Sequence, residues 1–513
     1  MAEGRVVTGR SKAERAPRAW PARVAMAGVL STAIAVAVVP TPSRAGGTEP
    51  GPKVVGRWSR PFDTGTVAVH SVLLHSGRVL IWFWPHAGLP TSDGTGSIAK
   101  LIDPKARTVI DASVPFAYDA FCAGHTVLAD GRVFVAGGNR YADPDYDGTR
   151  QTATFDLGDR SWTRADAMAF ARWYPSTTQL SNGDVLIMSG WETDHAEPVH
   201  RIERSHAGTG QITSLPSSAD LDMRLYPRTF LLPDGDVLRV GPDEMTSRLD
   251  TTSWTWSNVD SMVHGLRIAG AAVLLPGLDR VLALGGARPD GTTATDTAEI
   301  LELDRARPAW RSITPMHRER LYMNAVLLPD GDVLVIGGGR VAPWEGPVRT
   351  AELFDTQTET WRRMAPQAGS RMYHSTALLL PDGRVLSAGQ NDGDLQRTAE
   401  IYSPPYLFRG ARPRITSAPR VARYGRSIAV GTPDGARVSR VALIRAGSVT
   451  HSVNFDQRYV DLPFDRAKGG LTARIPSRAS VAPPGWYMLF LVDDDGVPSV
   501  ARWVRVTPER ATA

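Results

Sequence analysis

One cysteine, two tyrosines and two histidines stand out in this sequence of 513 residues, because their side chains could share a metal ion. Cys122 is the only cysteine, so it has no disulfide partner within the chain. Tyr174 lies in "RWYPS", the adjacent Tyr373 and His374 lie in "RMYHS", and His451 lies in "SVTHSVNFDQRY". Two imidazoles with phenolic oxygens form a nitrogen and oxygen donor set, which suits copper(II) and lacks the thiolates of a structural zinc site.

Each of these residues also has a structural explanation when it is taken alone. A lone cysteine is often a small buried hydrophobic residue, although an odd cysteine in an exported protein can also be reactive. On a regular strand, Tyr373 and His374 would face opposite ways. Both can bind one metal only if the backbone is irregular there, or if the metal sits at a strand end. The combination of residues therefore supports a site more strongly than any single member does.

The elements that must position these residues form a repeat. A pattern of two short apolar runs joined by a glycine turn, as in "HTVLADGRVFVAGG", occurs seven times, and a tryptophan follows most copies. Such turns are typical of β-hairpins, and four-stranded units of about 50 residues are typical of kelch-type propellers. We predict an all-β fold with a seven-bladed kelch-type β-propeller over residues 52–410. The turn glycines are Gly77, Gly131, Gly183, Gly235, Gly277, Gly331 and Gly383. The short interval from Gly235 to Gly277 predicts a trimmed blade or a misplaced turn.

The two ends of the chain differ from the repeat. Residues 1–45 hold a basic lead, an apolar stretch from Val24 to Val39 and small residues up to Ala45, which predicts an export signal. An uncleaved anchor is the alternative, although the apolar run is short. The rest of the chain has equal numbers of acidic and basic residues, so its charge gives no reason to expect nucleic-acid binding. Short alternating strands over residues 411–510 predict a small immunoglobulin-like β-sandwich.

Together, these segments resemble the copper radical oxidase family, which includes galactose oxidase and glyoxal oxidase. The resemblance rests on "DAFCAGHTVLADGRVFVAGGN", "ARWYPSTTQLSNGDVLIMSG", "SRMYHSTALLLPDGRVLSAG", "AEIYSPPYL" and "VTHSVNFDQRYVDLPF". It implies a thioether between Cys122 and the ring of Tyr174, which carries a radical. It also implies copper ligation by Tyr174, His374 and His451, with Tyr373 as axial ligand and general base. The implied reaction oxidises a primary alcohol or small aldehyde, or a carbohydrate, with O2 and releases hydrogen peroxide.

The resemblance is weaker around the centre. The family places a tryptophan over the crosslinked tyrosine, and Trp191 in "SGWETD" is the nearest candidate, one residue short of the galactose oxidase spacing. The segment before residue 52 is too short for that enzyme's sugar-binding domain. Further candidates are Trp173, Trp254 and Trp256 for the shielding tryptophan, and Arg224 and Arg228 for the arginine that contacts substrate.

Two other functions match parts of the sequence. A non-catalytic propeller could bind glycans or cell-wall polymers, but it would not need all five candidate residues. A hydrolase would need paired central carboxylates, and the best pair, Asp243 and Glu244, fits a turn better. We therefore predict a secreted, monomeric copper oxidase that uses no organic cofactor, binds no nucleic acid and contacts a membrane only if the leader is uncleaved.

Overall fold

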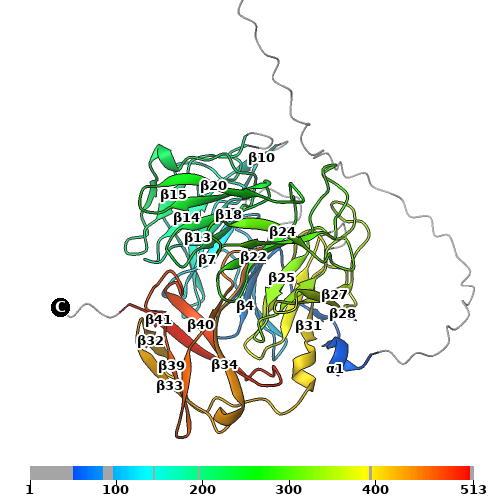
Figure 1. Ribbon diagram of the computed structural model, residues 1–513. Coiled ribbons are helices and arrows are strands. Elements are labelled where there is room, and N and C mark those ends of the chain that lie inside the picture. The colour runs from blue at the N-terminus through cyan, green and yellow to red at the C-terminus, as the bar shows by residue number, and fades with distance from the viewer. Residues whose placement is uncertain (1–49, 85–95, 143–144, 194–196, 392–394, 509–513) are drawn as a thin grey trace, which may run out of the picture. The chain divides into compact units, whose positions relative to one another are not determined.

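Strands dominate the secondary structure of the protein, and the few helices are short (Figure 1). A computed structural model describes residues 50–84, 96–142, 145–193, 197–391 and 395–508. Within these ranges the helices are α1 (Pro52–Val55) and the short 3-10 turns η1 (Ser217–Ala219), η2 (Pro405–Phe408) and η3 (Gly435–Arg437). The all-β prediction is thus confirmed for the part of the chain described. None of the helices found there has the length and apolar character needed to cross a bilayer. The predicted export signal over residues 1–45 lies outside the described residues.

All seven predicted hairpins are present, and each lies in its own sheet. The seven turn glycines have φ values from 81° to 107°, a left-handed conformation that glycine adopts without strain. The hairpins are β3 (His70–Leu73) with β4 (Val79–Phe83), β7 (Gly124–Val127) with β8 (Val133–Ala136), β13 (Ser176–Gln179) with β14 (Val185–Met188), β17 (Arg228–Leu231) with β18 (Val237–Val240), β21 (Ala271–Leu274) with β22 (Arg280–Leu284), β25 (Asn324–Leu327) with β26 (Val333–Ile336), and β29 (Ser375–Leu379) with β30 (Val385–Gly389).

Outer strands extend every hairpin into a larger sheet. The sheet of β17 and β18 is complete with four strands, so it is not trimmed, and its turn at Gly235 is correctly placed. Its repeat is short because β19 begins only five residues after β18 ends. The outer strands are β5 (Ile98–Asp103), β6 (Thr108–Asp111), β11 (Thr152–Asp156), β12 (Ser161–Arg164), β15 (Glu203–Ser205), β16 (Ile212–Ser214), β19 (Met245–Asp250), β20 (Thr255–Ser261), β23 (Ala298–Glu302), β24 (Ala309–Ile313), β27 (Thr350–Asp355), β28 (Thr360–Pro366) and β31 (Thr398–Ser403). A separate two-stranded sheet pairs β9 (Asn139–Ala142) with β10 (Asp145–Gly148).

The recurring tryptophans join neighbouring sheets. Trp162, on β12, donates its indole N–H to the carbonyl of Ala112, just after β6, at 2.7 Å. Trp361, on β28, donates in the same way to Thr314, just after β24, at 2.8 Å. These two tryptophans therefore belong to the packing of the scaffold and not to its chemistry.

The first strands of the seven sheets follow one another in space. Successive strands β7, β13, β17, β21, β25, β29 and β3 lie side by side. The N-terminal strands β1 (Arg57–Trp58) and β2 (Phe62–Asp63) pair with β31, so the seventh sheet contains both the first and the last strands of the repeat region. Two segments more than 300 residues apart in the sequence thus close this sheet.

The C-terminal strands form two sheets over a core of their own. One has the order β32 (Val421–Arg423), β41 (Arg502–Thr507), β40 (Gly485–Asp493), β34 (Val438–Arg445) and β37 (Arg458–Asp461). The other has the order β33 (Ser427–Gly431), β39 (Gly470–Arg474) and β38 (Phe464–Ala467). Strands β35 (Ser448–Thr450) and β36 (Val453–Asn454) leave these sheets: β35 pairs with β3, placing Thr450 opposite His70, and it also contacts β7. The segment that carries His451 is therefore part of a sheet of the repeat region.

Candidate metal centre

The structure brings the five candidate residues Cys122, Tyr174, Tyr373, His374 and His451 into one central cluster. The ligand atoms of Cys122, His374 and His451 all lie within 4.8 Å of one another. The hydroxyl oxygens of Tyr174 and Tyr373 are 2.8 Å apart, and the Cys122 Sγ is 3.4 Å from His451 Nε2. The ring centroids of Tyr174 and His451 are 5.1 Å apart. Two imidazole nitrogens, two phenol oxygens and one sulfur therefore converge.

Left-handed backbone conformations place these side chains. The φ angles are 59° at Cys122, 64° at Tyr174, 67° at His374 and 47° at His451, all in a region that non-glycine residues rarely occupy. The irregular backbone at His374 resolves the problem of adjacent residues facing opposite ways. The rings of Tyr373 and His374 stack at 3.7 Å and 27°, so both reach the same point.

Buried ion pairs hold the loops that carry the two tyrosines. Arg172 lies two residues before Tyr174, and its guanidinium bonds the Glu203 carboxylate at 2.9 Å, with both side chains fully buried. Arg371, before Tyr373, faces Glu400 in the same way at 3.5 Å. Since removing one partner of such a pair leaves an uncompensated buried charge, at a cost of roughly 3–5 kcal/mol, each pair keeps its loop in place.

The C-terminal segment that carries His451 is fixed by buried polar contacts to the repeat sheets. Arg445 donates to the Val127 carbonyl at 2.6 Å, and Asp456 accepts the Val127 amide at 2.7 Å. Arg458 donates to the Leu231 carbonyl at 2.8 Å. These contacts flank His451 on both sides in the sequence, so they anchor the segment from which it projects.

The two histidines of the central cluster present nitrogen lone pairs to it. His374 donates Nδ1–H to the side-chain oxygen of Asn391, and its buried Nε2 has no hydrogen-bond partner. Thr450 donates its hydroxyl to the carbonyl of Val69, so His451 must donate Nδ1–H to Thr450, at 2.5 Å. Burial lowers the pKa of His374 to about 3 and the pKa of His451 well below its ordinary value. Neutral imidazoles oriented through the second nitrogen are the usual form of histidine ligands, so this donor set fits a copper ion.

Burial favours the neutral forms of the phenols and the thiol. Burial raises the pKa of Tyr174 and of Tyr373, and the neighbouring Cys122 raises both further. Burial also raises the pKa of the Cys122 thiol, although a hydrogen bond with Tyr174 opposes the shift. That hydrogen bond places the sulfur beside the hydroxyl end of the Tyr174 ring. A bound metal ion would reverse this preference, because its positive charge favours the deprotonated oxygens.

Two of the four candidate tryptophans lie near Tyr174. The Trp173 ring is 4.5 Å from the Tyr174 ring, whereas the Trp191 ring is 6.4 Å away and approaches it edge-on at 86°. The backbones of Trp173 and Trp191 exchange two hydrogen bonds of 2.8 Å. Trp254 and Trp256 instead pack against a separate apolar cluster between two sheets, so they are not part of the site.

The arginines considered for substrate binding have structural partners. Arg224 forms an ion pair with Asp243 at 3.0 Å, and Arg239 contacts the same carboxylate at 2.7 Å. Arg228 is buried and donates to the Gly270 carbonyl. Asp243 is thus held by cations and Glu244 is exposed, so these two residues do not form a buried carboxylate pair for a hydrolase.

Sequence reasoning missed two tyrosines beside the central cluster. The Tyr226 ring lies 4.9 Å from His451 and 5.1 Å from Tyr174, and the Tyr322 ring lies 4.6 Å from Tyr373. Both have positive φ, 49° and 59°. A signal was available: Tyr174, Tyr226, Tyr322 and Tyr373 each follow an arginine by two residues. The repeat therefore delivers tyrosines to the same place from four sheets.

The carboxylate of Asp119, three residues before Cys122, leads to a pH-dependent prediction. It accepts the Phe121 amide at 3.0 Å and the Ser97 hydroxyl at 3.2 Å, and burial raises its pKa to about 7. The folded protein therefore favours the protonated acid. Its contribution to stability is fully present below about pH 4 and is lost as the pH rises to about 7. We expect Asp119→Asn to gain a few degrees in thermal midpoint relative to the parent between pH 4.5 and 7.5, measured by calorimetry. An equal difference between the two proteins at both pH values would contradict this prediction.

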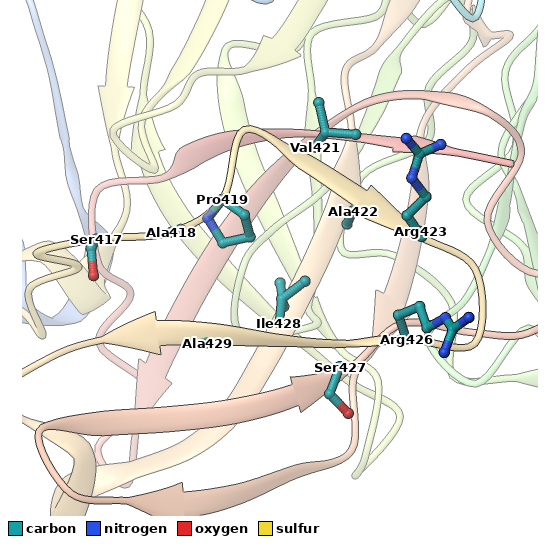
Figure 2. Close-up of a pocket in the computed structure, with 10 residues that line it drawn as sticks. All are labelled: Ser417, Ala418, Pro419, Val421, Ala422, Arg423, Arg426, Ser427, Ile428 and Ala429. Carbon is teal, nitrogen blue, oxygen red and sulfur yellow. The ribbon is translucent and has the colours of Figure 1, made fainter. Parts of the chain in front are cut away.

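A cavity of about 440 Å³ lies away from the central cluster, between β32 and β33 of the C-terminal sheets. Figure 2 shows Arg423 and Arg426 at one end of it and Ser417 at the other. None of the five residues of the central cluster lines this cavity. The volume of this cavity is therefore no evidence that it is the active site.

Comparisons with known proteins match this arrangement along most of the chain. Residues 99–405 match the family described as glyoxal oxidase N-terminus, and residues 412–506 match the galactose oxidase-like early set domain. The chain is 30% identical to galactose oxidase of Gibberella zeae over 498 residues, which covers 88% of this chain and 71% of that protein. It is 29% identical to aldehyde oxidase GLOX of Vitis pseudoreticulata, covering 76% of this chain and 82% of the relative. A fungal alcohol oxidase solved with copper superposes with a TM-score of 0.78 at 26% identity, covering 88% of this chain and all of that one.

Proposed function

The chain belongs to the family of galactose oxidase and glyoxal oxidase, and on that premise we propose that it oxidises a primary alcohol or small aldehyde with O2 and releases hydrogen peroxide. It is a copper-dependent oxidase, like the relatives it matches. One observation carries the proposal: the unpartnered, buried Nε2 of His374 faces a cluster that holds a second imidazole, two phenols and the chain's only cysteine.

Within this proposal, the residues of the central cluster have separate roles. His374 and His451, through Nε2, and Tyr174 and Tyr373, through their oxygens, would hold the copper. The sulfur of Cys122 would join the ring of Tyr174 as a thioether and would spread the spin of a Tyr174 radical. Bound copper supplies a one-electron acceptor, a position for the substrate oxygen and a route by which O2 is reduced to hydrogen peroxide.

Two phenols divide the movement of hydrogen from the substrate. The Tyr373 oxygen, which a bound metal ion would keep deprotonated, would accept the proton of the substrate hydroxyl. The oxygen of Tyr174, when it carries the radical, would accept the hydrogen atom from the substrate carbon. The two oxygens are 2.8 Å apart, so one small substrate group can face both. The apolar surroundings of Phe121, Trp173 and Trp191 keep water away from the radical.

The scaffold completes the proposal. The seven sheets close into a seven-bladed propeller over residues 52–410. Residues 411–510 form an immunoglobulin-like sandwich that contributes His451 to the central cluster. Trp191 and Trp173 together cover the crosslinked tyrosine. The chain is exported, acts as a monomer and takes its substrate from outside the cell.

A peroxide-release assay tests this function. The copper-loaded protein is incubated in air with glycolaldehyde, glyoxal, methylglyoxal, galactose and simple primary alcohols, and peroxide is measured with a coupled peroxidase. We expect at least one of these substrates to release one peroxide per molecule oxidised, and we expect no release after copper is chelated. Stoichiometric copper binding without peroxide from any substrate would contradict the oxidase function and favour a glycan-binding propeller.

A further inference from the structure

A buried histidine holds the backbone of Cys122. His70 Nε2 accepts the Cys122 amide at 2.9 Å, while the Cys122 carbonyl accepts the Tyr174 amide at 3.0 Å. Cys122 has φ of 59°, a conformation that persists in a non-glycine residue only when its surroundings hold it. One of the two groups that hold it is thus Tyr174 itself, and the other is the side chain of His70.

The contact continues as a hydrogen-bonded chain that ends in the C-terminal segment. His70 Nδ1 lies 3.1 Å from His125 Nε2, and His125 Nδ1 lies 2.5 Å from the hydroxyl of Ser448. The Ser448 hydroxyl in turn is 3.2 Å from the carbonyl of His125. We call His70, His125 and Ser448 the histidine chain. Its three members are completely buried.

Only one arrangement of protons satisfies the histidine chain. Because His70 Nε2 accepts from an amide, a neutral His70 must carry its proton on Nδ1 and donate it to His125 Nε2. His125 must then donate Nδ1–H to Ser448, which donates to the carbonyl. Burial lowers the pKa of both imidazoles, that of His125 to about 3, which agrees with two neutral rings. Every polar atom of the chain has a partner, so the chain fixes the position of the Cys122 amide.

The histidine chain links the two segments that must meet in the central cluster. His70 and His125 lie on β3 and β7, and Ser448 lies on β35, three residues before His451. Packing alone does not require this arrangement: His70 stacks on Trp82 at 4.6 Å and 1°, but that contact uses neither of its nitrogens. The nitrogens instead connect the cysteine segment to the segment that delivers the second histidine.

We propose that the histidine chain is a positioning device that holds Cys122 in its left-handed conformation, so that its sulfur points at the Tyr174 ring and the thioether forms. The inference rests on the proposed function. Joining sulfur to a ring carbon breaks one S–H and one C–H bond, forms one S–C bond and removes two electrons and two protons. The O2 of the proposed reaction accepts these as hydrogen peroxide in the presence of copper. The histidine chain itself exchanges no electrons and sets only the geometry.

The test measures thioether formation separately from copper binding. The protein is purified without copper, copper is added in air, and the loss of two hydrogens from the intact mass is followed with time. His70→Phe keeps a ring on Trp82 but removes both nitrogens. We expect its thioether to form at least tenfold more slowly than in the parent, while equilibrium dialysis without air still finds one copper per chain. His70→Gln restores an acceptor for the Cys122 amide, and we expect it to recover part of the rate.

His75→Phe is the matched control. His75 also stacks on a tryptophan, Trp486, at 4.4 Å and 7°, but it contacts no member of the histidine chain in the described structure. We expect this variant to form the thioether at the parental rate. A parental rate in His70→Phe, or equal slowing in both variants, would overturn the proposal. If His70→Phe does not fold, Ser448→Ala decides: a twofold or greater slowing supports the positioning role, and a parental rate removes it. A parent that forms no thioether under these conditions instead overturns the proposed cofactor, and the positioning role with it.

Discussion

Replacing Cys122 with alanine removes oxidase activity and leaves copper binding intact. We expect kcat/KM for the best substrate to fall at least 100-fold, which corresponds to a rise of about 3 kcal/mol in the activation free energy. The physical reason is that no thioether forms, so the spin of a Tyr174 radical stays on the phenol instead of spreading onto sulfur. The copper ligands themselves are unchanged, since His374, His451 and the two phenols supply the donor atoms in our proposal. Copper stoichiometry by equilibrium dialysis and peroxide release measured on the same sample check both parts.

Cys122→Ser serves as a second variant, because serine keeps a hydrogen-bonding group of similar size but cannot form the thioether. We expect it to lose activity as the alanine variant does. In the copper-loaded parent, a thiol reagent added after denaturation should find no free Cys122. If the parent keeps a fully reactive thiol and is active, Cys122 has no covalent role, and it is then either a copper ligand or a packing residue.

Replacing His374 or His451 with alanine lowers copper affinity at least 100-fold and abolishes activity. Each substitution removes one of the two imidazole nitrogens, leaving a donor set that is poorer in the nitrogen ligands that copper(II) prefers. His451 is also the residue that the C-terminal segment contributes to the central cluster, so its loss removes that segment from the proposed ligand set. Competition with a chromophoric chelator measures the affinity, and calorimetry of the metal-free variants checks that they remain folded.

The matched control for these variants is His264→Ala. His264 is exposed, follows the outer strand β20 and bonds the hydroxyl of Ser312, on the outer strand β24, at 2.9 Å. We expect its copper affinity and activity to equal those of the parent. Unchanged affinity in His374→Ala or His451→Ala would remove that residue from the ligand set.

The central cluster is assembled from two parts of the chain, the repeat sheets and the C-terminal sheets, which share one apolar core cluster. The C-terminal sheets also enclose an apolar cluster of their own, and β35 is hydrogen-bonded to β3. Both Ser448 of the histidine chain and His451 lie on or directly after that strand. The two parts therefore have to dock before the site is complete, and docking brings the second histidine and the support of Cys122 together.

Local sequence predicted the hairpins and nominated five residues that the structure brings together. Turn glycines between apolar runs predicted all seven hairpins, because a tight turn needs a positive φ that glycine supplies at no steric cost. The unusual residue types of Cys122, Tyr174, Tyr373, His374 and His451 were enough to nominate the central cluster. Both signals lie within short stretches of the chain, where spacing and residue type carry the information.

Tertiary structure alone decided how these residues meet. The backbone at His374 turns left-handed, so that adjacent residues face one point, and Trp173 lies closer to Tyr174 than the predicted Trp191 does. The histidine chain depends on contacts between residues as far apart as His125 and Ser448, and strand β35 pairs with β3 and not with the C-terminal sheets. No local pattern encodes such contacts, because they arise only when segments more than 300 residues apart pack together and bury their polar groups against one another.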